Sequence, residues 1–115
     1  MNKPDDRVLA WLDDLHRTLV TAGELADRGH DAYLSDGALP LAFEALSNRV
    51  GDLAKKLLAA DPARSDDPIW AQAARNRDFV VHQYHRVDVE LLWNTVVHDF
   101  PRLAALTERE LSEHR

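Results

Sequence analysis

Residues 8–26, VLAWLDDLHRTLVTAGELA, decide the fold class. Apolar residues recur in this stretch at alternating steps of four and three, at Val8, Leu12, Leu15, Leu19, Ala22 and Ala26. This spacing predicts an α-helix with a continuous apolar stripe along one side. We expect the helix to begin near Asp5 and Asp6, whose carboxylates can accept hydrogen bonds from free amides, and to end near Arg28 and Gly29.

A second stretch, residues 39–57, repeats the alternation and predicts a second long helix. Its apolar positions are Leu39, Phe43, Leu46, Val50, Leu53 and Leu57. Lys55 and Lys56 lie near its C-terminal end, where the helix dipole is negative. Gly51 lies inside it, where glycine costs about 1 kcal/mol relative to alanine, so we expect another helix to approach closely there. The connector, residues 30–39, has room for one short helical turn.

A polar segment with two prolines, residues 59–68, predicts a loop before the next helix. Asp67 and Pro68 are typical of a cap followed by a first-turn proline, so we expect a third helix from about residue 68 to about residue 84.

Asp88 resembles another cap and predicts a fourth helix. Its inward-facing residues are expected to be Val89, Leu92, Trp93, Val96, Phe100 and Leu103. Pro101 lies inside this helix and is expected to kink or restart it. No stretch has the alternation of a strand. The sequence therefore predicts an all-α bundle of four main helices, as a single domain over residues 1–115.

Composition and charge exclude several classes of protein. A chain of 115 residues is too short for a two-domain enzyme with separate cofactor and substrate lobes. The 14 Lys and Arg against 20 Asp and Glu give a net charge of -6, which argues against non-specific coating of nucleic acid. The absence of cysteine excludes disulfides, thiolate zinc sites and cysteine nucleophiles. No apolar run reaches the length of a signal peptide or a membrane span, so we expect a soluble, cytoplasmic protein.

The third predicted helix carries the residues with the clearest chemistry. One face of it comprises Trp70, Ala73, Ala74, Val80, Val81 and Tyr84, with Arg77 in the middle. An arginine there needs a carboxylate partner, a route to solvent or an anionic ligand, because an unpaired buried charge is costly. Asp78 and His82 are four residues apart, so the carboxylate can orient the imidazole.

Arg77 and His82 diverge by about 140° around the helix and by about 7.5 Å along it. For both to act on one phosphate, the ligand must lie across the helix end or a second chain must complete the site. Phe79 lies on the same broad side as His82, away from the Trp70 face. A helix with two apolar sides predicts a second interface, and a homodimer is the simplest one.

The spacing Arg77-Asp78-x-x-x-His82-x-Tyr84 resembles the motif of the HEPN superfamily, and specifically of its HepT-like toxin branch. The resemblance covers about residues 8–112. It implies a HEPN-like bundle and a metal-independent endoribonuclease, without a cofactor, that cleaves RNA. It also implies a homodimer whose two motifs meet across the interface. A partner nucleotidyltransferase antitoxin is implied as well, which attaches AMP to Tyr84.

Another register of the motif would begin at Arg75 and Asn76. Its histidine would then fall at position 80, which is Val80, so we align the motif on Arg77. Asp78 then stands where the family more commonly has asparagine.

The residue types suit RNA cleavage. His82 can move the proton of a 2′-hydroxyl, and Arg77 can stabilise the charge that builds on the phosphorane. Tyr84 can position the phosphate or stack on a base. Arg75 and Arg86 make the helix end locally basic.

A second function class stays open, a non-catalytic HEPN-like module that binds a nucleotide, RNA or a nucleotidyltransferase partner. The intact Arg77, His82 and Tyr84 favour the ribonuclease. Asp78 favours the binding module, because it adds negative charge beside a phosphate site. The remaining histidines lack partners at metal-ligand spacing, so we expect no metal site and predict surface positions for His16, His30, His98 and His114.

Overall fold

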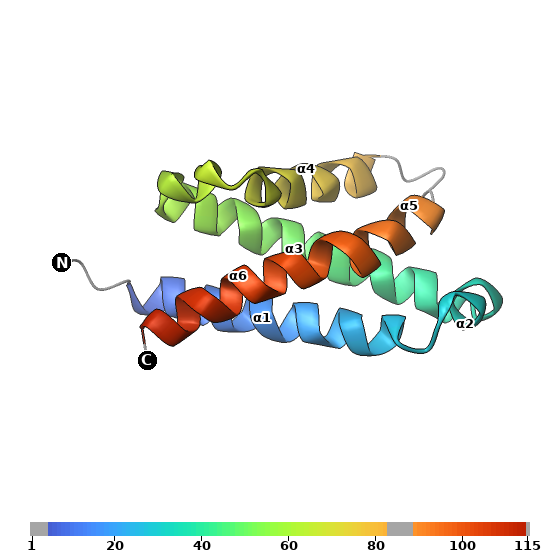
Figure 1. The fold of residues 1–115 in the computed structure, drawn as a ribbon. Helices are drawn as coiled ribbons and strands as arrows, with labels where there is room; N and C mark the ends of the chain where they lie inside the picture. The colour runs from blue at the N-terminus through green and yellow to red at the C-terminus, as the bar shows by residue number, and fades with distance from the viewer. Residues whose placement is uncertain (1–4, 83–88, 115) are drawn as a thin grey trace.

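The computed structural model describes the backbone of residues 5–82 and 89–114, and the side chains of the same ranges except those of residues 76–82. Every regular element in these ranges is a helix and none is a strand, which confirms the predicted all-α fold (Figure 1). The elements are α1 (Asp6–Ala26), α2 (His30–Ser35), α3 (Ala38–Ala60), the 3₁₀-helix η1 (Pro62–Asp66), α4 (Pro68–His82), α5 (Val89–Asn94), the π-helix η2 (Thr95–Asp99) and α6 (Phe100–Glu113).

The first two predicted helices are confirmed as α1 and α3. Asp5 caps α1, because its carboxylate accepts a hydrogen bond of 2.8 Å from the backbone N–H of Arg7. The helix ends at Ala26, slightly before the predicted end. Gly29 then adopts a φ of 98°, which favours glycine and turns the chain into α2.

The loop predicted over residues 59–68 is wrong in part, because α3 continues to Ala60 and η1 occupies Pro62–Asp66. Asp61 explains the short helix. Its carboxylate accepts a hydrogen bond of 3.1 Å from the N–H of Ala63, and a proline suits the first turn that follows.

Helix α4 begins where the sequence predicts. The carboxylate of Asp67 accepts a hydrogen bond of 3.0 Å from the N–H of Ile69, with Pro68 in the first turn. The described helix continues to His82, and the predicted end near residue 84 lies outside the described residues.

The fourth predicted helix is divided into α5, η2 and α6, and its predicted cap, Asp88, lies outside the described residues. The turn η2 is closed by a hydrogen bond from the N–H of Phe100 to the carbonyl of Thr95. In a regular helix the ring of Pro101 would clash with the carbonyl four residues earlier, and a wider π turn accommodates it. The disturbance predicted near Pro101 therefore lies in the turn before it.

The long helices enclose a single apolar core. Helix α3 packs against α4 on one side and α1 on the other, and α6 packs against α1 (Figure 1). The predicted stripes supply this core, with buried side chains at Leu12, Leu15, Leu19, Ala22, Leu39, Phe43, Val50, Leu53, Leu57, Leu92, Val96, Phe100 and Leu103. Gly51 is buried on α3 as well.

One predicted core residue is wrong, because Val89 is 39% exposed. It is the first residue of α5, and its backbone carbonyl accepts a hydrogen bond from the hydroxyl of Tyr33. Packing at this point uses the Val89 backbone while its side chain remains at the surface.

Candidate functional site

The predicted site residues that the structure describes lie on one helix. Helix α4 carries Arg75, Arg77, Asp78 and His82. Tyr84 and Arg86 lie outside the described residues, as do the side chains of residues 76–82. What the structure provides for this site is the continuous α4 backbone, which fixes the angles between the motif positions.

One side of α4 is buried as far as Ala74, and position 77 lies further along the same side of the helix. Trp70 is 3% exposed, and Ala73 and Ala74 lie beside it in the core. Seven residues return a helix to within about 20° of the same side, so position 77 falls on the Trp70 line. The predicted buried face is thus confirmed from Trp70 to Ala74, and the helix carries its register on to Arg77.

Position 82 falls on a different side of α4 from position 77. It lies seven residues after Arg75, whose side chain is exposed, so the two positions share one side of α4. Asp78 occupies the turn before His82. The side of α4 that position 77 shares with Trp70 and the side that position 82 shares with Arg75 differ by about 140°, with a rise of about 7.5 Å between the two positions.

A cluster that the sequence analysis missed joins α2 to the first turn of α5. The Nε2 atom of His30 lies 3.0 Å from each carboxylate oxygen of Glu90. The hydroxyl of Tyr33 donates a hydrogen bond of 2.7 Å to the carbonyl of Val89. The predicted surface position of His30 agrees with the 42% exposure of its side chain, and its ring also lies 5.0 Å from that of Trp93.

The local sequence holds no sign of this cluster, because His30 and Glu90 are 60 residues apart. In the bundle, α2 and α5 lie at the end where α3 begins and α4 finishes (Figure 1). The cluster is therefore at the same end of the molecule as the C-terminal turns of α4.

Two ion pairs with shifted pKa values lie elsewhere, on α1 and α3. The backbone N–H and the side chain of Arg7 lower the pKa of Asp5. The carboxylate of Asp14 raises the pKa of Arg49 through a hydrogen bond and its charge. Arg49 also donates to the hydroxyl of Thr18 at 3.2 Å, so this pair joins α3 to α1.

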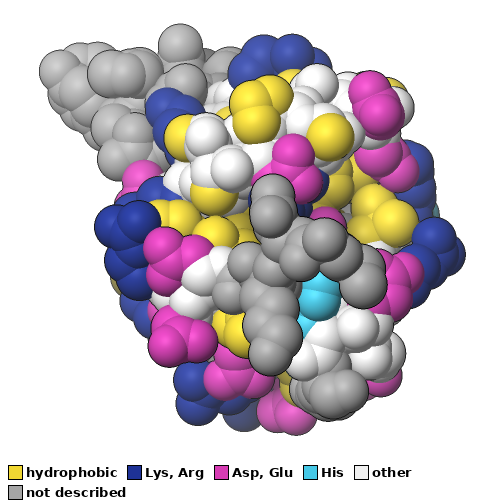
Figure 2. Space-filling model, turned by 90° about the vertical axis from the view of Figure 1, so that its left-hand side faces the viewer, with side chains coloured by type: hydrophobic (Ala, Val, Ile, Leu, Met, Phe, Trp, Pro, Cys, Tyr) yellow, Lys and Arg dark blue, Asp and Glu magenta, His cyan; other side chains and the backbone are white. Residues whose placement is uncertain are grey.

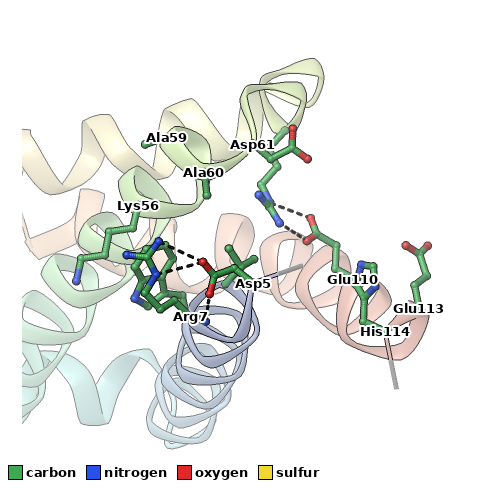
Figure 3. Close-up of a pocket in the computed structure, with 12 residues that line it drawn as sticks. Asp5, Arg7, Lys56, Ala59, Ala60, Asp61, Glu110, Glu113 and His114 are labelled. Atoms are coloured by element: carbon green, nitrogen blue, oxygen red, sulfur yellow. Dashed lines mark hydrogen bonds and ion pairs between the residues drawn. The ribbon is translucent and has the colours of Figure 1, made fainter. Parts of the chain in front are cut away.

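A cavity of about 980 Å³ lies at the opposite end of the bundle, where α1 begins and α3 and α6 finish (Figure 3). The charged groups that line it are nearly balanced in sign, with the cationic side chains of Arg7, Lys56 and Arg64 against the carboxylates of Asp5, Asp61, Glu110 and Glu113, and His114 lines it as well. Figure 2 shows this end of the molecule with basic and acidic side chains interspersed. Such a balance does not favour a polyanion, so this cavity does not resemble a site for an RNA backbone.

Among residues 5–75 and 89–114, no three His, Asp or Glu side chains gather closely enough to hold a metal ion. Within the described part of the chain, no helix has the length and apolar character that a membrane span requires.

The chain is similar in sequence to known proteins. The model of a family described as "Ribonuclease HepT-like" matches residues 13–110. A curated protein of Thermococcus cleftensis, "Probable ribonuclease HepT", is 45% identical over 40 residues. That match spans 35% of this chain and 36% of the length of the relative. No solved structure matches the chain significantly.

Proposed function

The chain belongs to the HepT-like ribonuclease family, and we propose that it is a metal-independent endoribonuclease toxin with Arg77 and His82 as its catalytic residues. One observation carries the proposal. The region matched by the family, residues 13–110, includes the spacing Arg77-Asp78-x-x-x-His82-x-Tyr84.

The proposed reaction is an attack of the 2′-oxygen of RNA on the adjacent phosphorus, with departure of the 5′-oxygen. His82 accepts the proton of the 2′-hydroxyl or donates a proton to the departing oxygen. Arg77 stabilises the negative charge that develops on the phosphorane, and its planar guanidinium can bind two phosphate oxygens at once. Tyr84 positions the phosphate or stacks on a base, while Arg75 and Arg86 attract the RNA strand.

The divergence of Arg77 and His82 on α4 supports a homodimer. The two positions lie on sides of the helix about 140° apart, so one phosphate reaches both only across the helix end or between two chains. We propose that a second copy of the chain completes the site by packing against the side of α4 that carries Phe79 and His82. Sedimentation at micromolar concentration tests this, and a strict monomer would contradict it.

We further propose that a nucleotidyltransferase antitoxin regulates the site in the cytoplasm by adenylylating Tyr84. The tyrosine oxygen attacks the α-phosphorus of ATP and pyrophosphate departs. The attached AMP brings a negative phosphate beside Arg77 and Arg86, and it occupies the space that the RNA phosphate needs. Intact-mass spectrometry after co-expression with the partner should show one AMP on Tyr84. A modification at another residue, or none with an active partner, would contradict this part of the proposal.

The experiment that tests the central proposal is RNA cleavage by purified His82→Ala protein. Positioned proton transfer typically contributes about 10²–10⁴-fold, so the rate should fall by at least about 10²-fold while the helical content is retained.

A second function rests on Asp78. Its carboxylate adds a negative charge beside the proposed phosphate site, which weakens the case for RNA cleavage and favours a non-catalytic module that binds a nucleotide, RNA or a nucleotidyltransferase partner. Folded His82→Ala protein that cleaves RNA or remains toxic at the wild-type level would leave this binding module as the better account.

A further inference from the structure

Helix α2 makes two polar contacts with the first turn of α5. The hydroxyl of Tyr33 donates a hydrogen bond of 2.7 Å to the carbonyl of Val89. The Nε2 atom of His30 lies 3.0 Å from each oxygen of the Glu90 carboxylate. Val89 and Glu90 are the first two residues of α5. A helix of six residues between α1 and α3 thus holds the start of a segment distant in sequence.

The Tyr33 hydroxyl is held in place by packing. Tyr33 is 1% exposed, and its ring centroid lies 4.7 Å from that of Phe43 on α3 and 5.1 Å from that of Trp93 on α5. The ring of His30 lies 5.0 Å from that of Trp93. Helices α3 and α5 therefore hold the Tyr33 side chain in place, and α5 also contacts the ring of His30.

The place of this contact in the sequence gives it a functional meaning. His82 is the last described residue of α4, and Val89 follows it after residues 83–88. These six residues include Tyr84 and Arg86. The segment that carries Tyr84 of the motif thus follows α4 in the sequence and is followed by Val89 and Glu90, with which α2 makes its polar contacts.

We propose that α2 anchors the downstream end of the motif segment, with Tyr33, His30 and Glu90 as positioning residues for RNA cleavage. The proposal rests on the proposed ribonuclease function. None of the three residues needs to touch RNA. Their effect on the motif follows from their place in the chain, because Val89 and Glu90 come five and six residues after Tyr84. A displacement of about 1 Å at a catalytic group can lower a rate by about 10²-fold.

The first test removes one hydroxyl. Tyr33→Phe keeps the ring against Phe43 and Trp93 and removes the hydroxyl that donates to the carbonyl of Val89. We expect kcat for RNA cleavage to fall by about 10- to 100-fold, because misplaced catalytic groups slow the chemical step. KM should stay within about twofold, because the residues proposed to contact the RNA strand are unchanged.

The matched control is Thr107→Val. Thr107 is fully buried on α6, and its hydroxyl also donates to a backbone carbonyl, that of Leu103 at 2.7 Å. It has no link to the motif segment in sequence. If Thr107→Val lowers kcat as much as Tyr33→Phe does, the loss reflects general destabilisation and the anchor is rejected.

The second test uses the contact between His30 and Glu90. The side chains of His30 and Glu90 are 42% and 53% exposed, and exposed pairs of this kind contribute little to folding stability. Glu90→Ala should therefore keep the unfolding temperature near that of wild type and still lower kcat by about tenfold. Glu90→Gln retains a hydrogen-bonding partner for His30 and should restore kcat to within about threefold of wild type.

Asp14→Ala is the control for the contact between His30 and Glu90, because it also breaks an interhelical side-chain contact, the ion pair of Asp14 with Arg49 between α1 and α3. It should leave kcat unchanged. A similar kcat for Glu90→Ala and wild type, or a similar loss for Asp14→Ala and Glu90→Ala, would overturn the proposal.

Hydrogen exchange separates this inference from the ribonuclease proposal. In Tyr33→Phe and Glu90→Ala, backbone amides in a peptide covering residues 83–92 should exchange faster than in wild type, and in Thr107→Val they should not. Unchanged exchange in both anchor variants would overturn the anchor, whatever the activity. A folded wild-type protein that does not cleave RNA would reject the ribonuclease proposal and the kinetic role of the anchor together, and faster exchange would then support the anchoring contact alone.

Discussion

His82 lies seven residues beyond Arg75 on the continuous helix α4, so the two positions share one side of that helix, and the side chain of Arg75 is exposed. Arg77 instead falls on the line of Trp70, which is 3% exposed. The two proposed catalytic residues thus belong to different sides of one helix. This separation is the geometric reason for expecting that a second chain completes the site.

Removal of divalent metal tests the mechanism directly. We expect RNA cleavage to persist in excess EDTA, because in the proposed mechanism His82 supplies the proton transfer and Arg77 the charge stabilisation that a metal would otherwise provide. Cleavage rates with and without chelator measure this. A complete loss that added magnesium or manganese restores would require a different mechanism.

The ion pair of Arg64 and Glu110 should be important for stability. The Arg64 side chain is 9% exposed, and it donates to both Glu110 oxygens at 3.1 and 2.7 Å. Its remaining nitrogen donates to the carbonyl of Leu57 at 2.9 Å, and its guanidinium lies 5.7 Å from the centre of the Trp70 ring. Glu110→Gln should lower the free energy of unfolding by about 1.5–3 kcal/mol, measured by urea denaturation, because Arg64 keeps its charge while its partner loses the negative charge and one of its two acceptor oxygens.

The control for that prediction is Arg102→Gln. Arg102 lies 3.8 Å from Asp67, and its side chain is 61% exposed, so solvent screens the pair. Loss of this ion pair should lower the free energy of unfolding by no more than about 1 kcal/mol. Equal effects of the two substitutions would show that burial of Arg64 adds nothing to its ion pair.

The cap of α1 should make stability depend on pH in the acid range. The hydrogen bonds and charge of Arg7 lower the pKa of Asp5 from its usual 3.8. The stabilisation from the ionised carboxylate is therefore complete above the unfolded pKa and is lost as the pH falls through the lower, folded value. Asp5→Asn retains an amide oxygen that can cap the helix but cannot titrate. The difference in unfolding temperature between wild type and Asp5→Asn should shrink between about pH 5 and pH 2, and a constant difference would contradict the assignment.

The long helices could be predicted because their periodicity is local. The four-three spacing of Leu12, Leu15 and Leu19 identifies the buried side of α1 without any knowledge of its neighbours, and the structure buries these residues. The same reasoning failed at η1, where the cap formed by Asp61 gives helical order to a segment with the composition of a loop. It also failed at Val89, because the first residue of a helix can pack through its backbone.

The site could be predicted only as positions on a helix. Residue spacing relates Arg77 to His82 and to Asp78, since all three lie on α4. It says nothing of contacts between segments that the fold brings together. The pair of His30 and Glu90 is of that kind, because its 60-residue separation leaves no periodic pattern to read.

The joint requirement for Arg77 and His82 is the most direct test of the mechanism. Arg77→Lys keeps the positive charge but loses the planar fork that binds two phosphate oxygens, so cleavage should fall by at least about tenfold. If the two groups act as one unit, the double variant Arg77→Lys/His82→Ala should be little slower than His82→Ala alone. Single-turnover cleavage of an RNA oligonucleotide, with circular dichroism to verify folding, measures both effects.

Arg75→Ala is the matched control, because Arg75 also lies on α4 and belongs to the register of the motif that places Val80 at the histidine position. Its loss removes one exposed charge that attracts the RNA strand. The substitution should therefore raise KM more than it lowers kcat. The rise in KM should become smaller as the salt concentration increases, because added ions screen the same attraction. A loss of kcat in Arg75→Ala as large as that in Arg77→Lys would contradict our alignment of the motif, because it would make the exposed side of α4 the source of both catalytic groups.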